Sequence, residues 1–316
     1  MKKALVTGGL GFIGSNLVGQ LLSNGYYVAV VDNLSAGLAG NLDEYKDNPN
    51  LDIYNPKVDI VDYKYVKDIC GGMDYVFHLA AMNRAMRSVA DPITSNKVNI
   101  EGTLNMLMSA RDAKVKKFIF ASSSSIYGEP NQQELERFPY GFPKDETMIP
   151  KPLTPYAIGK ITGEYYCDAF TKLFGLQTVV LRYFSVYGKK QRPDIEYAAV
   201  IPKFIKAIKE DKQPVIYGDG EQTRPFTYIK DVVRANILFA ENDATGIFNI
   251  ANHKTVSLNY LVSAINKILD KKIESIHDKP VKGEIKYTAV HCGKAIACGF
   301  SAEYSLEKGL NELING

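Results

Sequence analysis

The feature that most constrains the fold lies near the start of the chain, where a short apolar run meets a glycine-rich turn. Lys3–Thr7 (KALVT) is predicted to be a buried strand, and Phe12–Leu22 carries apolar residues at helical spacing. Between them, Gly8, Gly11 and Gly14 form a GxxGxxG pattern. Such a turn lets the backbone approach a pyrophosphate, and the helix N-terminus offers it free N–H groups. The alternative is an ordinary glycine-rich turn without a ligand, and the residues that follow distinguish between the two.

The next predicted strand ends in an acidic residue. Tyr27–Val31 is apolar and largely β-branched, and Asp32 follows it directly. A carboxylate about 20 residues after the glycines binds the ribose hydroxyls of adenosine and repels the 2′-phosphate of NADP. Asn33 and Ser35 follow in a loop suited to support that ribose. Together these residues predict a site for NAD.

Strand and helix patterns alternate through the first two-thirds of the chain. Further elements are predicted at Tyr75–Leu79, Pro92–Ala113, Lys117–Ala121, Pro155–Phe174 and Gln177–Tyr183. This alternation predicts an α/β fold with a Rossmann-type, doubly wound parallel sheet. We expect residues 1–188 to form the NAD-binding domain. Residues 189–316, with shorter and less regular units, are expected to form mainly a smaller C-terminal α/β substrate lobe, with some segments returning to the first domain.

Charge and composition narrow the possible partners. The net charge is +3, from 38 basic and 35 acidic side chains without a basic block, so neither nucleic acid nor a membrane is expected as a partner. The four cysteines form no CxxC pair and the four histidines no HExxH spacing, so no metal site is expected. No apolar run is long enough to span a bilayer, and the N-terminus lacks a cleavage pattern. We therefore expect a cytoplasmic protein.

A second motif points to acid–base chemistry. Tyr156 and Lys160 stand at i and i+4, on one face of the predicted helix. A tyrosine with a pKa near 10 is a poor base at neutral pH, and a nearby ammonium group lowers that pKa. A surface pair is the alternative, because this spacing is frequent by chance. Pro155 fits the start of a helix, and Ser122–Ser125 follows the Lys117–Ala121 strand at its carboxyl end, where open α/β sheets bind ligands.

With these motifs placed, the sequence resembles the extended short-chain dehydrogenase/reductase family, and within it the UDP-N-acetylglucosamine and UDP-glucose 4-epimerases. The matching segments run over nearly the whole chain and include TGGLGFIG, VDNLS, ASSSSIYGEP, PLTPYAIGK, LRYFSVYG and GDGEQTRPFTYIKDV. MRSVADP and YAAVIPK resemble the N-acetyl-sugar branch. The resemblance implies NAD-dependent 4-epimerisation of a UDP-hexose. The sugar would be oxidised transiently at C4 to a 4-keto sugar, which rotates before the hydride returns.

The resemblance also implies roles for individual residues. Tyr156 would take the proton of the sugar 4-hydroxyl, Lys160 would lower its pKa, and Ser123 would relay the proton. The implied NAD-binding residues are Gly8, Gly11, Phe12, Ile13, Gly14, Asp32, Asn33, Ser35, Asp59, Ile60, Leu79, Ala80, Ala81, Asn99, Ser122, Tyr156, Lys160 and Tyr183. The implied substrate-binding residues are Arg87, Ser123, Ser124, Tyr156, Ser185, Val200, Tyr217, Arg224 and Thr288. Among them, Arg224 would hold the diphosphate and Tyr217 would lie near the uracil.

Four positions depart from the family pattern. They are Ser185 in place of asparagine, Pro225 in place of aspartate, Val281 in place of an arginine for the diphosphate, and His291 in place of aspartate. Lys282 or Arg87 is the candidate to replace the missing arginine. Thr288 stands where a bulky tyrosine excludes N-acetyl groups in the family, so we expect the pocket to admit them.

Other functions remain open at this point. A UDP-glucuronate 4-epimerase or a decarboxylase would begin with the same C4 oxidation. A 4,6-dehydratase needs acid–base carboxylates where this chain has Ser124 and Ser125, which disfavours it. A non-catalytic NAD-binding regulatory protein would not need the Tyr156–Lys160 pair. The long helices Pro92–Ala113 and Pro155–Phe174 resemble those that pair into a four-helix bundle, so a homodimer is expected.

Overall fold

The structure is a computed structural model and describes residues 1–316 except 56–57, 84, 131, 139–141, 196–197 and 281–285. The chain forms two compact units whose segments alternate along the sequence. The first unit comprises Met1–Ile126, Pro150–Tyr183 and Val233–Phe248, and the second comprises Tyr127–Ile149, Phe184–Val232 and Asn249–Gly316. These units are defined by packing, whereas the predicted division at residue 188 separates NAD-binding from substrate-binding roles. That division stays a prediction.

The first unit is built on a sheet that has seven strands in the described residues, in the order β12-β7-β5-β4-β1-β2-β3. The strands are β1 (Lys3–Thr7), β2 (Tyr27–Val31), β3 (Leu51–Ile53), β4 (Tyr75–His78), β5 (Lys117–Ser123), β7 (Thr178–Tyr183) and β12 (Gly246–Ile250). Neighbours from β3 to β7 pair in parallel. β4 and β7 are buried throughout, as strands covered by helices on both faces must be. The predicted Rossmann-type α/β fold is confirmed.

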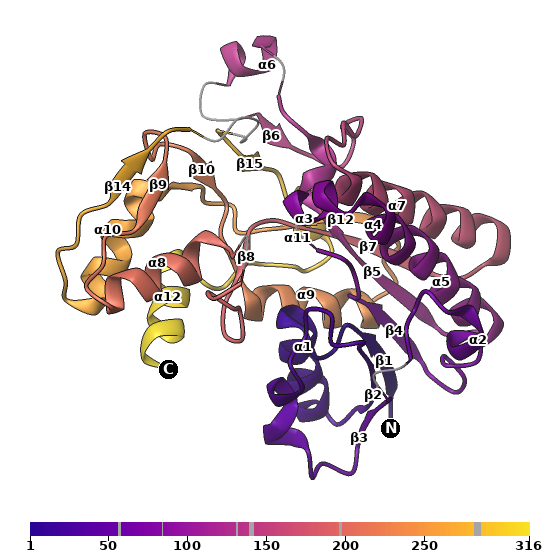
Figure 1. Cartoon of the computed structure of the whole chain (residues 1–316). Coiled ribbons are helices and arrows are strands. Elements are labelled where there is room, and N and C mark those ends of the chain that lie inside the picture. The colour runs from indigo at the N-terminus through magenta and orange to yellow at the C-terminus, as the bar shows by residue number, and fades with distance from the viewer. Residues whose placement is uncertain (56–57, 84, 131, 139–141, 196–197, 281–285) are drawn as a thin grey trace. The chain divides into compact units, whose positions relative to one another are not determined.

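Helices connect these strands and cover the sheet (Figure 1). They are α1 (Phe12–Ser23), α2 (Tyr63–Val66), α3 (Ala85–Ala90), α4 (Pro92–Asn96), α5 (Gly102–Asp112), α7 (Pro155–Phe174) and α9 (Ile229–Glu241), with 3-10 segments η1 (Ala39–Tyr45) and η3 (Ser124–Tyr127). α1 packs on β1 and β2, whereas α7 packs on β5 and β7. Phe118, Phe120 and Leu107 are fully buried in the core that these elements enclose.

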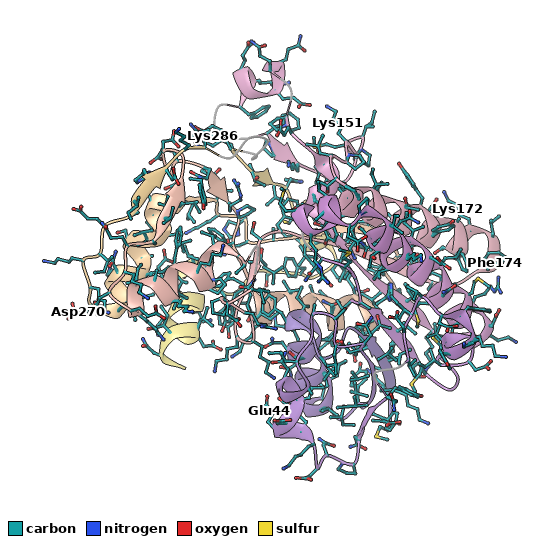
Figure 2. All side chains as sticks on the ribbon, in the orientation of Figure 1. Glu44, Lys151, Lys172, Phe174, Asp270 and Lys286 are labelled. Carbon is teal, nitrogen blue, oxygen red and sulfur yellow. The ribbon has the colours of Figure 1, made fainter. Side chains whose placement is uncertain are left out.

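Local sequence signals fix both ends of α7. Thr154 is its N-cap and accepts a hydrogen bond from the Ala157 N–H, and Pro155 occupies the first turn. The helix ends at Gly175, whose φ of 70° lies in the left-handed region that glycine adopts without strain. The predicted bounds of this helix, Pro155–Phe174, are confirmed. Figure 2 shows Lys172 and Phe174 at its C-terminal end.

The single α-helix predicted over Pro92–Ala113 is divided by a π-helical segment. The structure has α4, then a π-helical segment η2 (Lys97–Glu101), then α5. Here α7 comes very close, because a Cβ added at Gly159 would lie 2.7 Å from the Cβ of Asn99. The extra residue in the π turn leaves Asn99 buried against α7, and such bulges are frequent at functional sites.

The second unit contains helices and short paired strands. Its helices are α6 (Gln132–Arg137), α8 (Val200–Lys209), α10 (Leu258–Leu269), α11 (Gly293–Ala297) and α12 (Leu306–Asn315). Its strands are β6 (Pro143–Lys144), β8 (Val186–Tyr187), β9 (Val215–Tyr217), β10 (Thr223–Arg224), β11 (Thr227–Tyr228), β13 (Val256–Ser257), β14 (Ile276–Asp278) and β15 (Ala289–Val290). They pair as β10·β13, β8·β11, β9·β14 and β6·β15, while α10 packs against α8 and α12.

None of the described helices is both long enough and apolar enough to cross a bilayer.

Candidate active site

The glycine-rich turn has the geometry that its sequence predicts. Gly8 has φ of 70°, and a Cβ there would lie 2.8 Å from the backbone nitrogen of Ala80. A Cβ at Gly14 would collide with the carbonyl oxygen of Gly8. The turn therefore requires glycine at both places. Gly11 caps α1 without a side-chain hydrogen bond, so the first N–H groups of the helix remain available to a phosphate.

Asp32 is held at the end of β2 by backbone donors. Its carboxylate accepts hydrogen bonds from the N–H groups of Leu10 at 3.0 Å and Leu34 at 2.8 Å. Burial raises the pKa of this carboxyl, and the backbone hydrogen bonds oppose that rise. The carboxylate is thus fixed beside the glycine-rich turn, where the ribose of a dinucleotide is expected.

Asn33 and Asp59 form the neighbouring wall. The Asn33 amide donates to Asp59 at 2.6 Å, and Asp59 also accepts from the Val61 N–H at 3.1 Å. The Asn33 side chain in turn accepts from the Ser35 N–H at 3.0 Å. This chain of bonds orders the loop after β2 against the segment that precedes α2.

These residues line a pocket in the first unit. The predicted NAD-binding residues that line it are Gly8, Gly11, Phe12, Ile13, Gly14, Asp32, Asn33, Ser35, Asp59, Ile60, Leu79, Ala80, Ala81, Ser122, Tyr156, Lys160 and Tyr183. Sequence reasoning missed Val31, Ala36, Gly37, Val58, Asn83, Val98 and Ala121, which also line it. Among these, Gly37 could have been suspected from its residue type, because glycine allows close approach. In the structure, a Cβ at this position would lie 3.0 Å from the Asp32 carboxylate. Glycines that allow close approach of the backbone, a free helix N-terminus and a carboxylate at the end of β2 fit NAD.

Asn99 is the predicted NAD-binding residue that stands apart from this lining. Its amide accepts from the Met82 N–H at 2.9 Å and donates to the Met82 carbonyl and to Ser95, both at 3.2 Å. It therefore ties η2 to the loop after β4, while its neighbour Val98 lines the pocket.

Tyr156 and Lys160 line the same pocket, and Ser123 directly follows the lining residue Ser122. β5 continues through Ser123, two residues beyond its predicted end, so Ser122 and Ser123 belong to the strand and Ser124 begins η3. The Lys160 ammonium lies 5.8 Å from the centre of the Tyr156 ring, and the side chain of Ser123 lies close enough to the Tyr156 hydroxyl to influence its pKa. Burial raises the pKa of Tyr156, and the nearby Ser123 side chain opposes that rise. Because burial raises this pKa, Tyr156 depends on Lys160 to act as a base near neutral pH, and that role of Lys160 stays a prediction.

His78 is a structural residue. It is fully buried and bridges Thr7, at 2.8 Å from Nδ1, and Thr103, at 3.1 Å from Nε2. Burial lowers the pKa of this histidine to about 3, so its ring is neutral at physiological pH.

The predicted substrate residues divide between the two units. Arg87, Ser123, Ser124 and Tyr156 belong to the first, and Ser185, Val200, Tyr217, Arg224 and Thr288 belong to the second. In the second unit, Arg224 donates to the carbonyls of Thr223 at 2.8 Å and Lys286 at 3.1 Å. The buried Thr288 donates its N–H to the Thr223 carbonyl at 3.3 Å. Thr288, the residue before β15, thus lies beside β10, which carries Arg224.

The departures from the family pattern have different structural settings. Ser185 has φ of 38°, a left-handed conformation that asparagine adopts more readily than serine, which accounts for the usual asparagine. Pro225 is buried between β10 and β11, and His291 is exposed after β15. Val281 and Lys282 lie outside the described residues.

The fold and the pocket define a dinucleotide-dependent enzyme of the extended short-chain dehydrogenase/reductase type. The chain belongs to the NAD dependent epimerase/dehydratase family, whose pattern matches residues 4–251, and NAD is its cofactor. The family resemblance predicted from the sequence is confirmed.

Solved structures of similar proteins cover almost the whole chain. A UDP-N-acetylglucosamine 4-epimerase from Methanobrevibacter ruminantium M1, in complex with UDP-N-acetylmuramic acid, is 39% identical, with a TM-score of 0.92 over 99% of this chain and 97% of that one. A UDP-glucose 4-epimerase from Thermotoga maritima with UDP-glucose is 38% identical, with a TM-score of 0.90 over 99% and 97%. A UDP-glucuronic acid 4-epimerase from Bacillus cereus, in complex with UDP-glucuronic acid and NAD, is 33% identical, with a TM-score of 0.87 over 99% and 98%.

Proposed function

We propose that this protein is a UDP-hexose 4-epimerase that accepts UDP-N-acetylglucosamine. The observation that carries the proposal is the pair formed by Tyr156 and Lys160 on the wall of the NAD pocket, where the ammonium lies 5.8 Å from the centre of the tyrosine ring. NAD, when bound, supplies a reversible hydride acceptor for C4 of the sugar. A general base at the adjoining 4-hydroxyl is the remaining chemical requirement.

The residues of the chain meet that requirement in defined ways. Tyr156 accepts the proton of the 4-hydroxyl and returns it when the new configuration forms. Ser123 hydrogen-bonds the tyrosine hydroxyl and relays the proton, and the Lys160 ammonium stabilises the phenolate. Residues 189–316 supply the nucleotide contacts in this proposal, with Arg224 at the diphosphate and Tyr217 near the uracil.

The choice of sugar rests on Thr288 and on the comparisons. Threonine at this position is much smaller than the tyrosine that excludes N-acetyl groups in the family. The similar protein from Methanobrevibacter ruminantium is named a UDP-N-acetylglucosamine 4-epimerase, which supports the same choice. A missing clash permits binding without creating a preference, so UDP-glucose is expected as a second substrate.

A UDP-glucuronate 4-epimerase is the second candidate. The similar Bacillus cereus protein carries that name, and the same C4 chemistry would serve it. A dehydratase is disfavoured because Ser124 and Ser125 begin η3 where acid–base carboxylates would be needed.

Product analysis separates these functions. The purified protein is incubated with UDP-N-acetylglucosamine, UDP-glucose and UDP-glucuronate in turn, and the products are resolved by chromatography and NMR. Formation of the 4-epimer of the first sugar at a rate at least comparable to that of the second supports the proposal. Turnover of UDP-glucuronate alone, release of carbon dioxide, or no turnover of any sugar contradicts it.

We propose in addition that the chain forms a homodimer through a four-helix bundle. Apolar side chains on α4 and α7 are exposed, including Ile93 at 70% and Tyr165 at 63%. Patches of this kind commonly mark protein interfaces. Light scattering should give a dimer for the protein and a monomer for the double variant Ile93→Lys/Tyr165→Lys. A monomeric unaltered protein, or a variant that stays dimeric, contradicts this arrangement.

A further inference from the structure

An ion pair lies in the interior of the first unit, behind the pocket wall. Nη2 of Arg182 on β7 lies 2.6 Å from Oε2 of Glu164 on α7, and Nε of Arg182 donates to Oε1 at 3.0 Å. The two side chains are only 2% and 1% exposed. Two charges lose their hydration in such a place, and well-packed apolar residues are often at least as stable there. Stability is therefore a poor explanation for the pair.

The ion pair is connected to Lys160 through the end of β5. Glu164 follows Lys160 by one turn of α7, so both side chains lie on one helix face. The Ser122 hydroxyl donates to Glu164, and the preceding residue, Ala121, accepts a hydrogen bond from the Lys160 ammonium at 2.7 Å. Two consecutive residues of β5 thus fix the carboxylate and the ammonium group at a set separation.

We propose that Glu164 is a positioning residue that keeps Lys160 in its charged form beside Tyr156, and that Arg182 is a positioning residue that holds the Glu164 carboxylate in place and moderates its effect on Lys160. The proposal rests on the function proposed above, in which Lys160 supports proton transfer by Tyr156. Glu164 supplies a negative charge one helical turn from Lys160, and Arg182 orients that carboxylate with two hydrogen bonds and limits its field. Burial lowers the pKa of Lys160 to about 8, and the charge of Glu164 opposes this decrease.

The other titratable groups around Lys160 do not supply a buried negative charge at neutral pH, so this role falls to Glu164. Tyr156 and Cys167 lie on α7 itself, His78 lies on β4 and is neutral, and Tyr183 lies on β7. Burial raises the pKa values of Cys167 and Tyr183, so these groups carry no charge at neutral pH, and Tyr156 is the group whose proton transfer Lys160 supports in the proposed function. The charged residues on α3, η2 and α5, which also pack against α7, are partly or fully exposed; they are Arg87, Lys97, Glu101, Arg111 and Asp112.

Nuclear magnetic resonance can measure the ionisation of Lys160 directly. The NAD-containing protein is labelled with lysine carrying ¹³C at Cε, and the Lys160 resonance is assigned by its loss in Lys160→Met. We expect a midpoint near pH 8 in the unaltered protein. Glu164→Gln should lower it by about one pH unit or more, because the carboxylate is lost while the guanidinium stays. Arg182→Gln should raise it, and the double variant Glu164→Gln/Arg182→Gln should return it toward the original value.

Conservative and distant variants serve as controls. Glu164→Asp keeps the charge and should hold the midpoint near its original value, and Glu101→Gln on the exposed side of η2 should not move it. The alkaline limb of kcat/KM should follow the same order of variants. If the pair had a purely structural role, both single variants would lose kcat/KM equally, and the Lys160 midpoint would not shift in opposite directions.

The outcomes distinguish this inference from the proposed function. Opposite shifts of the Lys160 midpoint without turnover of any UDP-sugar would retain the positioning role at Lys160 and overturn the epimerase assignment. Normal epimerase activity with an unmoved midpoint in either folded single variant would overturn the positioning role. If neither single variant folds, the double variant carries the test, and a midpoint that stays clearly displaced in a folded double variant would overturn the positioning role, because the two opposite effects should then cancel.

Discussion

The Lys160 ammonium donates a hydrogen bond to the carbonyl oxygen of Ala121 at 2.7 Å, inside the sheet end that forms the pocket wall. Burial lowers the pKa of this lysine to about 8, so the group is charged below that pH and neutral above it. Because the charged form supports the Tyr156 phenolate, kcat/KM should fall as pH rises through about 8. The measurement is a pH profile with UDP-N-acetylglucosamine.

Lys117 provides a matched control for that profile. It is another buried lysine on β5, and its ammonium donates to the carbonyls of Asn242 and Ala244 instead of lining the pocket. Lys117→Met should leave the alkaline limb in place. A limb that shifts with Lys117, or a flat profile from pH 7 to about 10, would show that Lys160 does not govern the reaction.

Tyr156→Phe should remove most of the turnover. The phenylalanine keeps the ring against Lys160 but has no group to accept the 4-hydroxyl proton, so kcat should fall by about 100-fold or more. NAD content and thermal stability should be retained. Tyr165→Phe, on the exposed face of the same helix, should retain full activity. Near-normal turnover in Tyr156→Phe would exclude this tyrosine as the base.

The Asp32 carboxylate should determine which dinucleotide the protein holds. Nucleotide released by denaturing the purified protein should be mainly NAD, because the carboxylate repels a 2′-phosphate. Asp32→Asn keeps acceptor and size but removes the charge, so it should narrow the preference for NAD over NADP. Mass spectrometry of the released nucleotide gives the ratio. Dominant NADP in the unaltered protein would mean that Asp32 does not face the ribose.

Thr288→Tyr should discriminate between substrates. If Thr288 limits the room around the sugar 2-substituent, a tyrosine should suppress turnover of UDP-N-acetylglucosamine by about 10-fold or more, while UDP-glucose is affected much less. The measurement is kcat/KM for both sugars in both proteins. Equal loss for the two sugars would place the limiting residue elsewhere in the second unit.

The sequence predicts the NAD pocket better than the path of the helices around it. The glycine-rich turn and Asp32 could be recognised because each is a local requirement of backbone geometry or charge. The π segment at Lys97–Glu101 could not, since the apolar pattern is compatible with an unbroken helix and the cause is the close approach of Gly159 in a distant segment. The proposed roles of Glu164 and Arg182 could not be predicted from the sequence either, because neither residue belongs to a local motif.

The central claim, reversible oxidation at C4 with Tyr156 as base, can be tested most directly with an isotope. UDP-N-acetylglucosamine carrying deuterium at C4 is incubated with the protein in ordinary water until the epimers equilibrate. We expect the 4-epimer to form with the deuterium retained at C4, and Tyr156→Phe to form about 100-fold less of it in the same time. A 4-epimer whose C4 carries hydrogen from the solvent, or no 4-epimer at all, would contradict the account.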